Sequence, residues 1–245
     1  MDNLDRARIA HLLDVLGIDL GGLKRGRGKI VLIAGDSCAG KTSMARRIIN
    51  HAPQFRILNT GDFFREEAKK LNLSLGELIK ASDEDLMKLD KSVDARIIKH
   101  LVETDETLVV TSHLAAPLAQ ILRLAGKSPL IISLLVDKNE KISRMSHREF
   151  GKGSFEISEE ETEKMNEELK RDERDLERYE KVYNLDPRSF YRYSCVVDTS
   201  DLNEREVWKK VMELVDDYII GGLKVEGEFS EVEDYSRLLG LSSAV

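Results

Sequence analysis

The chain has 245 residues, of which 41% are hydrophobic and 34% are charged. A chain of this length and apolar content can bury a substantial core, which excludes an intrinsically disordered protein. Its net charge of −7 argues against a general nucleic-acid binder, because no global positive field attracts a phosphate backbone.

Two cysteines, Cys38 and Cys195, are too few for a disulfide framework and favour a reducing compartment. The N-terminus lacks the charged start and apolar run of a signal peptide. The longest apolar stretch, residues 130–136, is far too short to span a membrane. We therefore expect a cytoplasmic protein with neither a membrane nor a nucleic acid as its partner.

In chain order, the first predicted element is a short amphipathic helix over residues 5–16, followed by a glycine-rich approach up to residue 28. Strand and helix patterns then alternate, which predicts an α/β fold whose parallel sheet is covered by helices on both faces. Two longer helices are predicted over 82–103 and 158–183, with a hinge-like break at 151–154. The five predicted strands are residues 30–34, 55–58, 107–111, 130–136 and 195–197.

The motif that carries chemistry follows the first strand and matches the pattern G-x-x-x-x-G-K-[ST]. In such a loop, successive backbone N–H groups surround phosphate oxygens, and the start of the next helix adds its positive end. Lys41 is predicted to reach the β- and γ-phosphates of ATP, and the Thr42 hydroxyl to ligate Mg²⁺. An ordinary glycine-rich turn would leave both residues unexplained. The predicted ATP-binding residues are Gly35, Asp36, Ser37, Cys38, Ala39, Gly40, Lys41 and Thr42.

The segment after the second predicted strand, Thr60-Gly61-Asp62-x-x-Arg65, resembles the acceptor-site motif of nucleoside monophosphate kinases. The resemblance is most specific to archaeal-type cytidylate kinases. It extends over residues 29–219 and leaves both termini outside. Further matching segments are 60–75, 89–96, 171–179, 183–186 and 196–200.

This resemblance implies a three-layer P-loop kinase fold with sheet order 2-3-1-4-5 and a helical lid. It implies transfer of the ATP γ-phosphoryl, with Mg²⁺, to a small-molecule acceptor, with CMP or dCMP as the leading candidates. The implied organisation is an N-terminal helical extension (1–28), a kinase domain (29–219) and a C-terminal extension (220–245). Within the kinase domain, residues 62–103 would bind the acceptor and residues 148–183 would form the lid.

The resemblance also implies residue roles. Lys41, Arg148 and Arg171 would be catalytic, because permanently charged arginines neutralise developing phosphate charge. Residues 198–200 would lie beside the adenine. The charged lid helix taken alone is more typical of a solvated, salt-bridged surface, and only the preceding motifs favour a functional role for Arg171; Asp94 is equally typical of a helix surface. The implied acceptor-binding residues are Asp62, Arg65, Asp94, His113, Arg174 and Arg178.

The sequence departs from the family pattern after the third strand. An acidic residue followed by Gly-Arg-Leu-Ala-Gly is expected there, and Thr111, Ser112 and His113 stand in its place. His113 could donate a hydrogen bond, act as a general base for an alcohol acceptor, or be a buried structural histidine. The alternatives are therefore a kinase of another small hydroxyl compound, or an ATP-binding regulatory protein without transfer activity. The oligomeric state is left open.

Overall fold

The computed structural model describes residues 1–60, 63, 66, 69–70, 83–151 and 158–221. Within them, five parallel strands form one sheet in the order β2-β3-β1-β4-β5, which confirms the predicted topology. Each strand boundary differs from its predicted position by at most one residue. The strands are β1 (Ile30–Gly35), β2 (Arg56–Asn59), β3 (Leu108–Thr111), β4 (Leu130–Leu135) and β5 (Cys195–Asp198).

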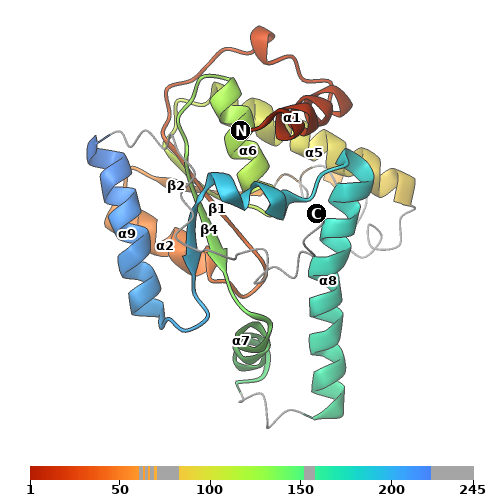
Figure 1. Cartoon of the computed structure of the whole chain (residues 1–245), viewed down its shortest axis with the longest axis vertical. Coiled ribbons are helices and arrows are strands. Elements are labelled where there is room, and N and C mark those ends of the chain that lie inside the picture. The colour runs from red at the N-terminus through yellow and green to blue at the C-terminus, as the bar shows by residue number, and fades with distance from the viewer. Residues whose placement is uncertain (61–62, 64–65, 67–68, 71–82, 152–157, 222–245) are drawn as a thin grey trace.

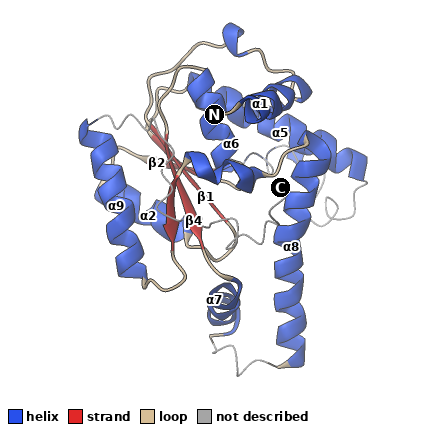
Figure 2. Ribbon diagram, viewed as in Figure 1, coloured by secondary structure: helices blue, strands red, loops and turns tan. Residues whose placement is uncertain are grey.

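Helices cover both faces of this sheet (Figure 1, Figure 2). α2 and α9 lie on one face, and α5 and α6 lie on the other. α7 and α8 extend below the carboxyl ends of the strands in this view. The helices are α1 (Asn3–Val15), α2 (Lys41–His51), α5 (Asp83–Glu103), α6 (Ala115–Leu124), α7 (Lys138–Phe150), α8 (Glu159–Tyr183) and α9 (Glu204–Gly221), with short 3₁₀ helices η1 (Leu20–Gly22) and η2 (Pro187–Tyr193).

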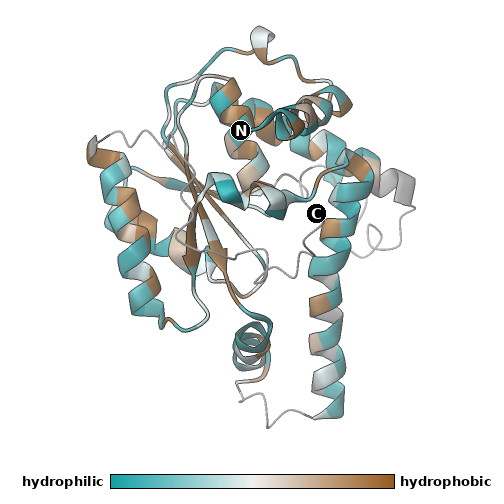
Figure 3. Ribbon diagram, in the orientation of Figure 1, coloured by the Kyte–Doolittle hydropathy of each residue, from teal (hydrophilic) through white to brown (hydrophobic). Residues whose placement is uncertain are grey.

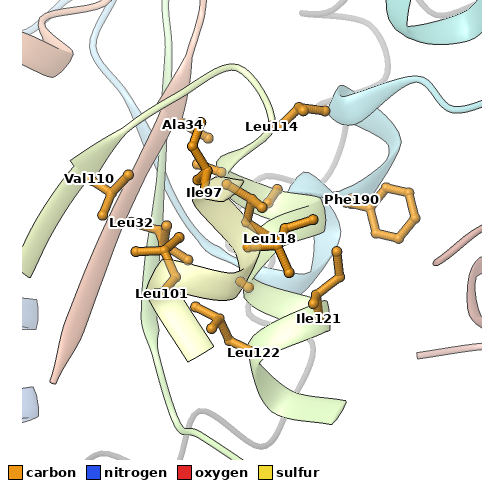
Figure 4. Close-up of a cluster of buried hydrophobic side chains, with 14 of the residues drawn as sticks. Leu32, Ala34, Ile97, Leu101, Val110, Leu114, Leu118, Ile121, Leu122 and Phe190 are labelled. Carbon is orange, nitrogen blue, oxygen red and sulfur yellow. The ribbon is translucent and has the colours of Figure 1, made fainter. Parts of the chain in front are cut away.

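The two core layers arise from the alternation of side chains along the strands. In β1, Leu32 and Ala34 face the layer of α5 and α6, whereas Val31 and Ile33 face α2 and α9. All six residues of β1 are buried, as expected for a central strand with helices on both sides. Figure 4 shows the first layer, where Leu32 lies among side chains of α5 and α6.

The N-terminal helix α1 packs onto the same core as the sheet. Its Ile9 and Leu12 are fully buried in the layer that contains α5 and α6. Buried Asp5 accepts a hydrogen bond from Tyr193 Oη at 2.8 Å and pairs with Arg192, both in η2. The hydrophobic core therefore extends across the predicted boundary at residue 28 and includes α1.

Among the described helices, α8 is the most polar, and its ribbon in Figure 3 is mainly hydrophilic with a few apolar turns. Its observed start at Glu159 agrees with the predicted helix, and the predicted hinge lies partly outside the described residues, at 152–157. Of the helices that the structure describes, none combines the length and apolarity needed to cross a membrane.

The order of the strands locates the candidate site. β1 lies between β3 and β4, and the chain leaves β1 toward β2 on one side before it returns to β4 on the other. In open parallel sheets, ligands bind outside the carboxyl ends of the strands at such a switch point. The loop after β1 lies at this position.

Candidate active site

The phosphate-loop motif joins the carboxyl end of β1 to the amino end of α2. Three of its residues have φ in the left-handed range, namely Gly35 at 138°, Cys38 at 62° and Gly40 at 95°. A Cβ at Gly35 would lie 2.4 Å from the Leu134 carbonyl oxygen of β4, so space also requires glycine there. Tight turns of this kind bring successive backbone N–H groups around one phosphate.

Lys41, the first residue of α2, is held against this loop. Its Nζ donates to the carbonyl oxygens of Gly35 at 2.6 Å and Asp36 at 2.7 Å. Burial lowers the pKa of Lys41, and the carboxylates of Asp172 and Asp36 oppose that shift. Thr42 follows in the first turn of α2 with an exposed side chain. The Lys41 ammonium and the Thr42 hydroxyl thus lie beside the loop, where the motif predicts a phosphate and a metal ion.

Two residues that no sequence pattern singled out also contact the loop. The Ser37 backbone N–H donates to Asp172 Oδ2 at 3.1 Å, and its hydroxyl donates to Asp172 Oδ1 at 2.6 Å. Lys141 Nζ lies 2.6 Å from Asp172 Oδ2 and 3.6 Å from Asp36 Oδ2. Asp172 belongs to the segment 171–179, which resembles the lid of cytidylate kinases and is expected to act through its arginines. Nothing in the sequence brings Lys141 to the loop.

Lys141 reaches this position because α7 is well defined at both ends. Asp137 caps its amino end by accepting from the N–H groups of Asn139 and Glu140. Gly151, at φ 66°, ends the helix in the left-handed conformation that favours glycine. Lys141 lies in the first turn and is almost fully buried, with 8% of its surface exposed.

His113 lies in the turn between β3 and α6. Burial lowers the pKa of its imidazole, and the positive charge of Lys41 lowers it further. Asp172, Asp175 and Asp36 act in the opposite direction, which places His113 within electrostatic reach of the loop and of α8. A lowered pKa leaves the imidazole neutral at pH 7, so its unprotonated nitrogen can accept a proton.

The predicted lid arginines differ in how near they lie to the phosphate loop. Arg148, in the last turn of α7, is near enough to Cys38 for its charge to oppose the rise in the Cys38 pKa that burial causes. Its Nε also lies 2.6 Å from Glu149 Oε1. Arg174 is exposed on α8, and its Nε donates to the Lys170 carbonyl oxygen at 3.3 Å. Arg171 belongs to α8, and its side chain lies outside the described residues.

Asp94 and Arg178 meet where α5 packs against the last turns of α8. Tyr183 Oη donates to Asp94 Oδ2 at 2.6 Å. Arg178 Nε lies 2.9 Å from Asp90 Oδ2, and Nη2 lies 3.1 Å from Asp175 Oδ1. Burial raises the pKa of Asp94 to about 7 and that of Asp90 to about 6. Both predicted acceptor residues therefore connect the two helices.

The other predicted acceptor residues, Asp62 and Arg65, lie outside the described residues. The described chain leads toward them from the end of β2, where Thr60 Oγ1 donates to the Thr111 carbonyl oxygen at 3.5 Å. The acceptor motif thus begins beside Thr111, the last residue of β3. His113 follows Thr111 by two residues.

The residues after β5 are joined to the phosphate loop through α7. Arg144 Nη1 donates to Thr199 Oγ1 at 2.9 Å and to the Cys38 carbonyl oxygen at 3.5 Å. Ser200 Oγ donates to Asp198 Oδ1 at 2.7 Å, which shapes the turn that follows the strand. Residues 198–200, predicted to adjoin the adenine, therefore lie at the same carboxyl edge of the sheet as the phosphate loop.

Comparison with known proteins matches these features to a family. The sequence model of a family described as "AAA domain" matches residues 31–166, more than half of the chain. The chain belongs to this AAA domain family. The AAA domain match includes the phosphate loop, His113 and Lys141, and it ends before Asp172.

Individual relatives of this AAA domain protein are distant. The cytidylate kinase of Saccharolobus islandicus (strain L.S.2.15 / Lassen #1) is 24% identical over 183 residues, which cover 75% of this chain and 88% of that protein. The cytidylate kinase of Sulfolobus acidocaldarius is 26% identical over 177 residues, 72% of this chain and 88% of that protein. Among solved structures, shikimate kinase from Aquifex aeolicus vf5 matches with a TM-score of 0.43 and 14% identity, covering 79% of this chain and 99% of that chain.

Proposed function

We propose that this protein transfers the γ-phosphoryl group of ATP, with Mg²⁺, to a nucleoside monophosphate, CMP or dCMP, and releases ADP and the diphosphate. The observation that carries the proposal is the phosphate loop after central strand β1, with Lys41 bonded to its carbonyl oxygens. The name of the distant relatives, cytidylate kinase, supports the choice of acceptor.

In this proposal, residues 35–42 hold the ATP phosphates through backbone N–H groups, and Lys41 turns its ammonium from the loop carbonyls to the β- and γ-phosphates. The exposed Thr42 hydroxyl would hold Mg²⁺, which supplies neutralising charge to the same phosphates. Phosphoryl transfer needs positioning and charge neutralisation more than covalent chemistry by the protein. Arg148 and Arg171 are assigned to neutralising the transferred group.

The acceptor is assigned to the region between the carboxyl ends of β2 and β3 and the helices α5 and α8. Arg65 would bind the acceptor phosphate as a bidentate partner, and Asp62 would adjoin it. Asp94, Arg174 and Arg178 would complete the site from the two helices. Because Asp94 already accepts a hydrogen bond from Tyr183 and Arg178 already forms an ion pair with Asp90, acceptor binding would exchange these contacts for contacts to the ligand. We assign residues 29–219 to the catalytic unit and 148–183 to its lid.

A second candidate function follows from His113. This residue takes the place of the arginine expected in cytidylate kinases, and its lowered pKa provides a neutral imidazole near Lys41. A neutral base beside the transferred phosphoryl group suits an alcohol acceptor, whose hydroxyl proton must be removed. A phosphate acceptor is already ionised and needs no such base. The second candidate is therefore a kinase of a small hydroxyl metabolite.

The test measures ADP release with ATP-Mg²⁺ against CMP, dCMP, the other nucleoside monophosphates and a panel of small alcohols. Turnover on CMP or dCMP above the other acceptors supports the leading proposal, and turnover on an alcohol alone supports the second. Tight ATP binding with no turnover on any acceptor overturns both and favours a regulatory ATP-binding protein.

The variant His113→Arg separates the two kinases further. It restores the cation that cytidylate kinases are expected to carry, so CMP turnover should rise if the protein is a cytidylate kinase with an altered acceptor site. If the imidazole is a base for an alcohol, the variant should lose that activity, because arginine does not deprotonate at neutral pH.

A further inference from the structure

A carboxylate of the chain itself occupies donors of the phosphate loop. Asp172 binds Ser37 through both oxygens, Oδ2 to the backbone N–H at 3.1 Å and Oδ1 to the hydroxyl at 2.6 Å. Asp172 and Ser37 are 135 residues apart in sequence, so α8 brings this anion to the loop from outside. The Asp172 carboxylate accepts a hydrogen bond from a backbone N–H of the loop, as a phosphate oxygen would in such a loop.

The carboxylate is held there as a charged group. Lys141 Nζ lies 2.6 Å from Asp172 Oδ2, and both side chains are nearly buried, with 10% and 6% of the side-chain surface alone exposed. Burial would raise the pKa of Asp172, but the hydrogen bonds from Lys141 and Ser37 hold it below the usual value. Asp172 also raises the pKa of Lys41, so its negative charge acts on the lysine predicted to bind ATP.

We propose that Asp172 and Lys141 form an anion-exchange latch. Asp172 occupies a phosphate position of the loop in the nucleotide-free protein, a terminal phosphate of ATP displaces it, and Lys141 then pairs with that phosphate. The proposal rests on the proposed function, in which the loop binds ATP. The contacts of α8 and α7 to the loop would therefore change when ATP binds, because α8 carries the displaced carboxylate and α7 carries the lysine.

The physical reason for exchange is charge. A triphosphate and a buried carboxylate on the same loop repel each other strongly where water screens little. A buried ion pair that loses one partner leaves an uncompensated charge, which is strongly unfavourable. When Asp172 leaves, Lys141 needs a new anion, and the incoming phosphate supplies it. Asp36, 3.6 Å from Lys141 Nζ, keeps the lysine near the loop during the exchange.

The first experiment measures the ATP dissociation constant of the full chain with Asp172→Asn by calorimetry. Asparagine keeps the size of the side chain and removes its charge, so ATP no longer has a competitor. We expect ATP to bind about tenfold more tightly than to the unaltered protein. The matched control is Glu173→Gln, which removes the same charge from the neighbouring exposed position and should change the constant by less than about twofold.

The second experiment isolates Lys141. With Asp172→Asn as the background, adding Lys141→Gln should weaken ATP binding by about tenfold, because the variant removes the cation that pairs with the phosphate after the Asp172 carboxylate is gone. Hydrogen exchange of unaltered protein gives a readout that does not depend on any variant. Adding ATP should change amide protection around residue 172 in α8, and Asp172→Asn without ATP should show part of that change.

The outcomes distinguish this inference from the proposed function. If the unaltered protein binds ATP but Asp172→Asn binds it no more tightly, and α8 protection is unchanged by ATP, the latch is wrong while the kinase proposal stands. If neither the unaltered protein nor the Asp172→Asn variant binds ATP, both are wrong. Tighter binding in Asp172→Asn together with weaker binding in the double variant supports the latch.

Discussion

At the scale of one residue, Lys41 shows how the free protein holds a cation beside the phosphate loop. Its Nζ donates to two carbonyl oxygens of the loop, whereas burial disfavours its charged form and lowers its pKa. Such a group is poorly solvated before the ligand arrives. It can therefore bind a polyphosphate without first losing a full hydration shell.

Lys41→Ala should lower phosphoryl transfer by roughly 10²–10³-fold, because one preorganised charge is removed from the transferred group. The fold should persist, since both hydrogen bonds of the Lys41 ammonium within the described part of the chain go to the loop itself. The measurement is ADP release under saturating acceptor, with circular dichroism as the check on folding. Lys210→Ala, on an exposed position of α9, is the matched control and should retain full activity. Equal activity in both variants would remove Lys41 from the site.

Asp94 predicts a pH dependence of stability. Burial raises its pKa from 3.8 to about 7, so the folded state holds the proton more tightly than the unfolded chain. The resulting stabilisation is complete below pH 3.8 and is lost as the pH rises through about 7. Tyr183 and Arg178 face this carboxyl and favour its ionised form, whereas Asp90 disfavours it. Asp94 alone should lower the free energy of unfolding by about 2 kcal/mol between pH 5 and pH 8, and Asp90, whose pKa burial raises to about 6, adds a smaller fall in the same direction.

Urea unfolding at the two pH values measures this difference. Asp94→Asn cannot ionise and keeps an acceptor for Tyr183, so the fall should be smaller by about 2 kcal/mol in that variant, and the part that belongs to Asp90 should remain. Asp201→Asn, at an exposed turn after β5, should leave it unchanged. A fall that persists at full size in Asp94→Asn would assign the effect to another group.

At the scale of elements, α1 is part of the fold's core although it precedes the AAA domain match, which begins at residue 31. Ile9 and Leu12 are buried with α5 and α6, and Asp5 ties the helix to η2 through Tyr193 and Arg192. The helix therefore supports η2, which in turn contacts α6 and β5. Because η2 joins α8 to β5 in the chain, α1 contributes to the position of these two elements through η2.

Leu12→Ala should destabilise the protein by about 2–5 kcal/mol, because it removes buried apolar atoms and leaves a cavity. Leu4→Ala on the same helix is the control. Leu4 is 61% exposed, so its truncation should cost less than about 0.5 kcal/mol. Denaturant unfolding of the two variants gives both values. Equal values would mean that α1 does not share the core in solution.

At the scale of the whole molecule, the loop, α7 and α8 converge below the carboxyl ends of the strands (Figure 1). Anything that binds the folded loop and not the unfolded chain must stabilise the entire domain by mass action. ATP-Mg²⁺ at a hundredfold excess over its dissociation constant should therefore add about 2.7 kcal/mol and raise Tm by about 5 °C or more. Thermal unfolding followed by fluorescence measures the shift. The same nucleotide should leave the Tm of Lys41→Ala nearly unchanged, and an equal shift there would place ATP elsewhere.

The sequence by itself determined the features that depend on neighbouring residues. Buried runs such as residues 130–135 read as strands because both faces must be apolar, and eight consecutive residues specify the phosphate loop. The order of the sheet came from the resemblance, since strand patterns alone do not say which strands pair.

Only the tertiary structure decided which distant side chains meet. Ser37 and Asp172 are 135 residues apart, and Lys141 joins them from a third element, so their contact depends on how α7 and α8 pack beyond the sheet. The burial that raises the pKa of Asp94 depends on the same packing, because an aspartate on a charged helix gives no sign in the sequence of facing a tyrosine. Local patterns specify which backbone forms; long-range packing specifies which charges are brought together out of water.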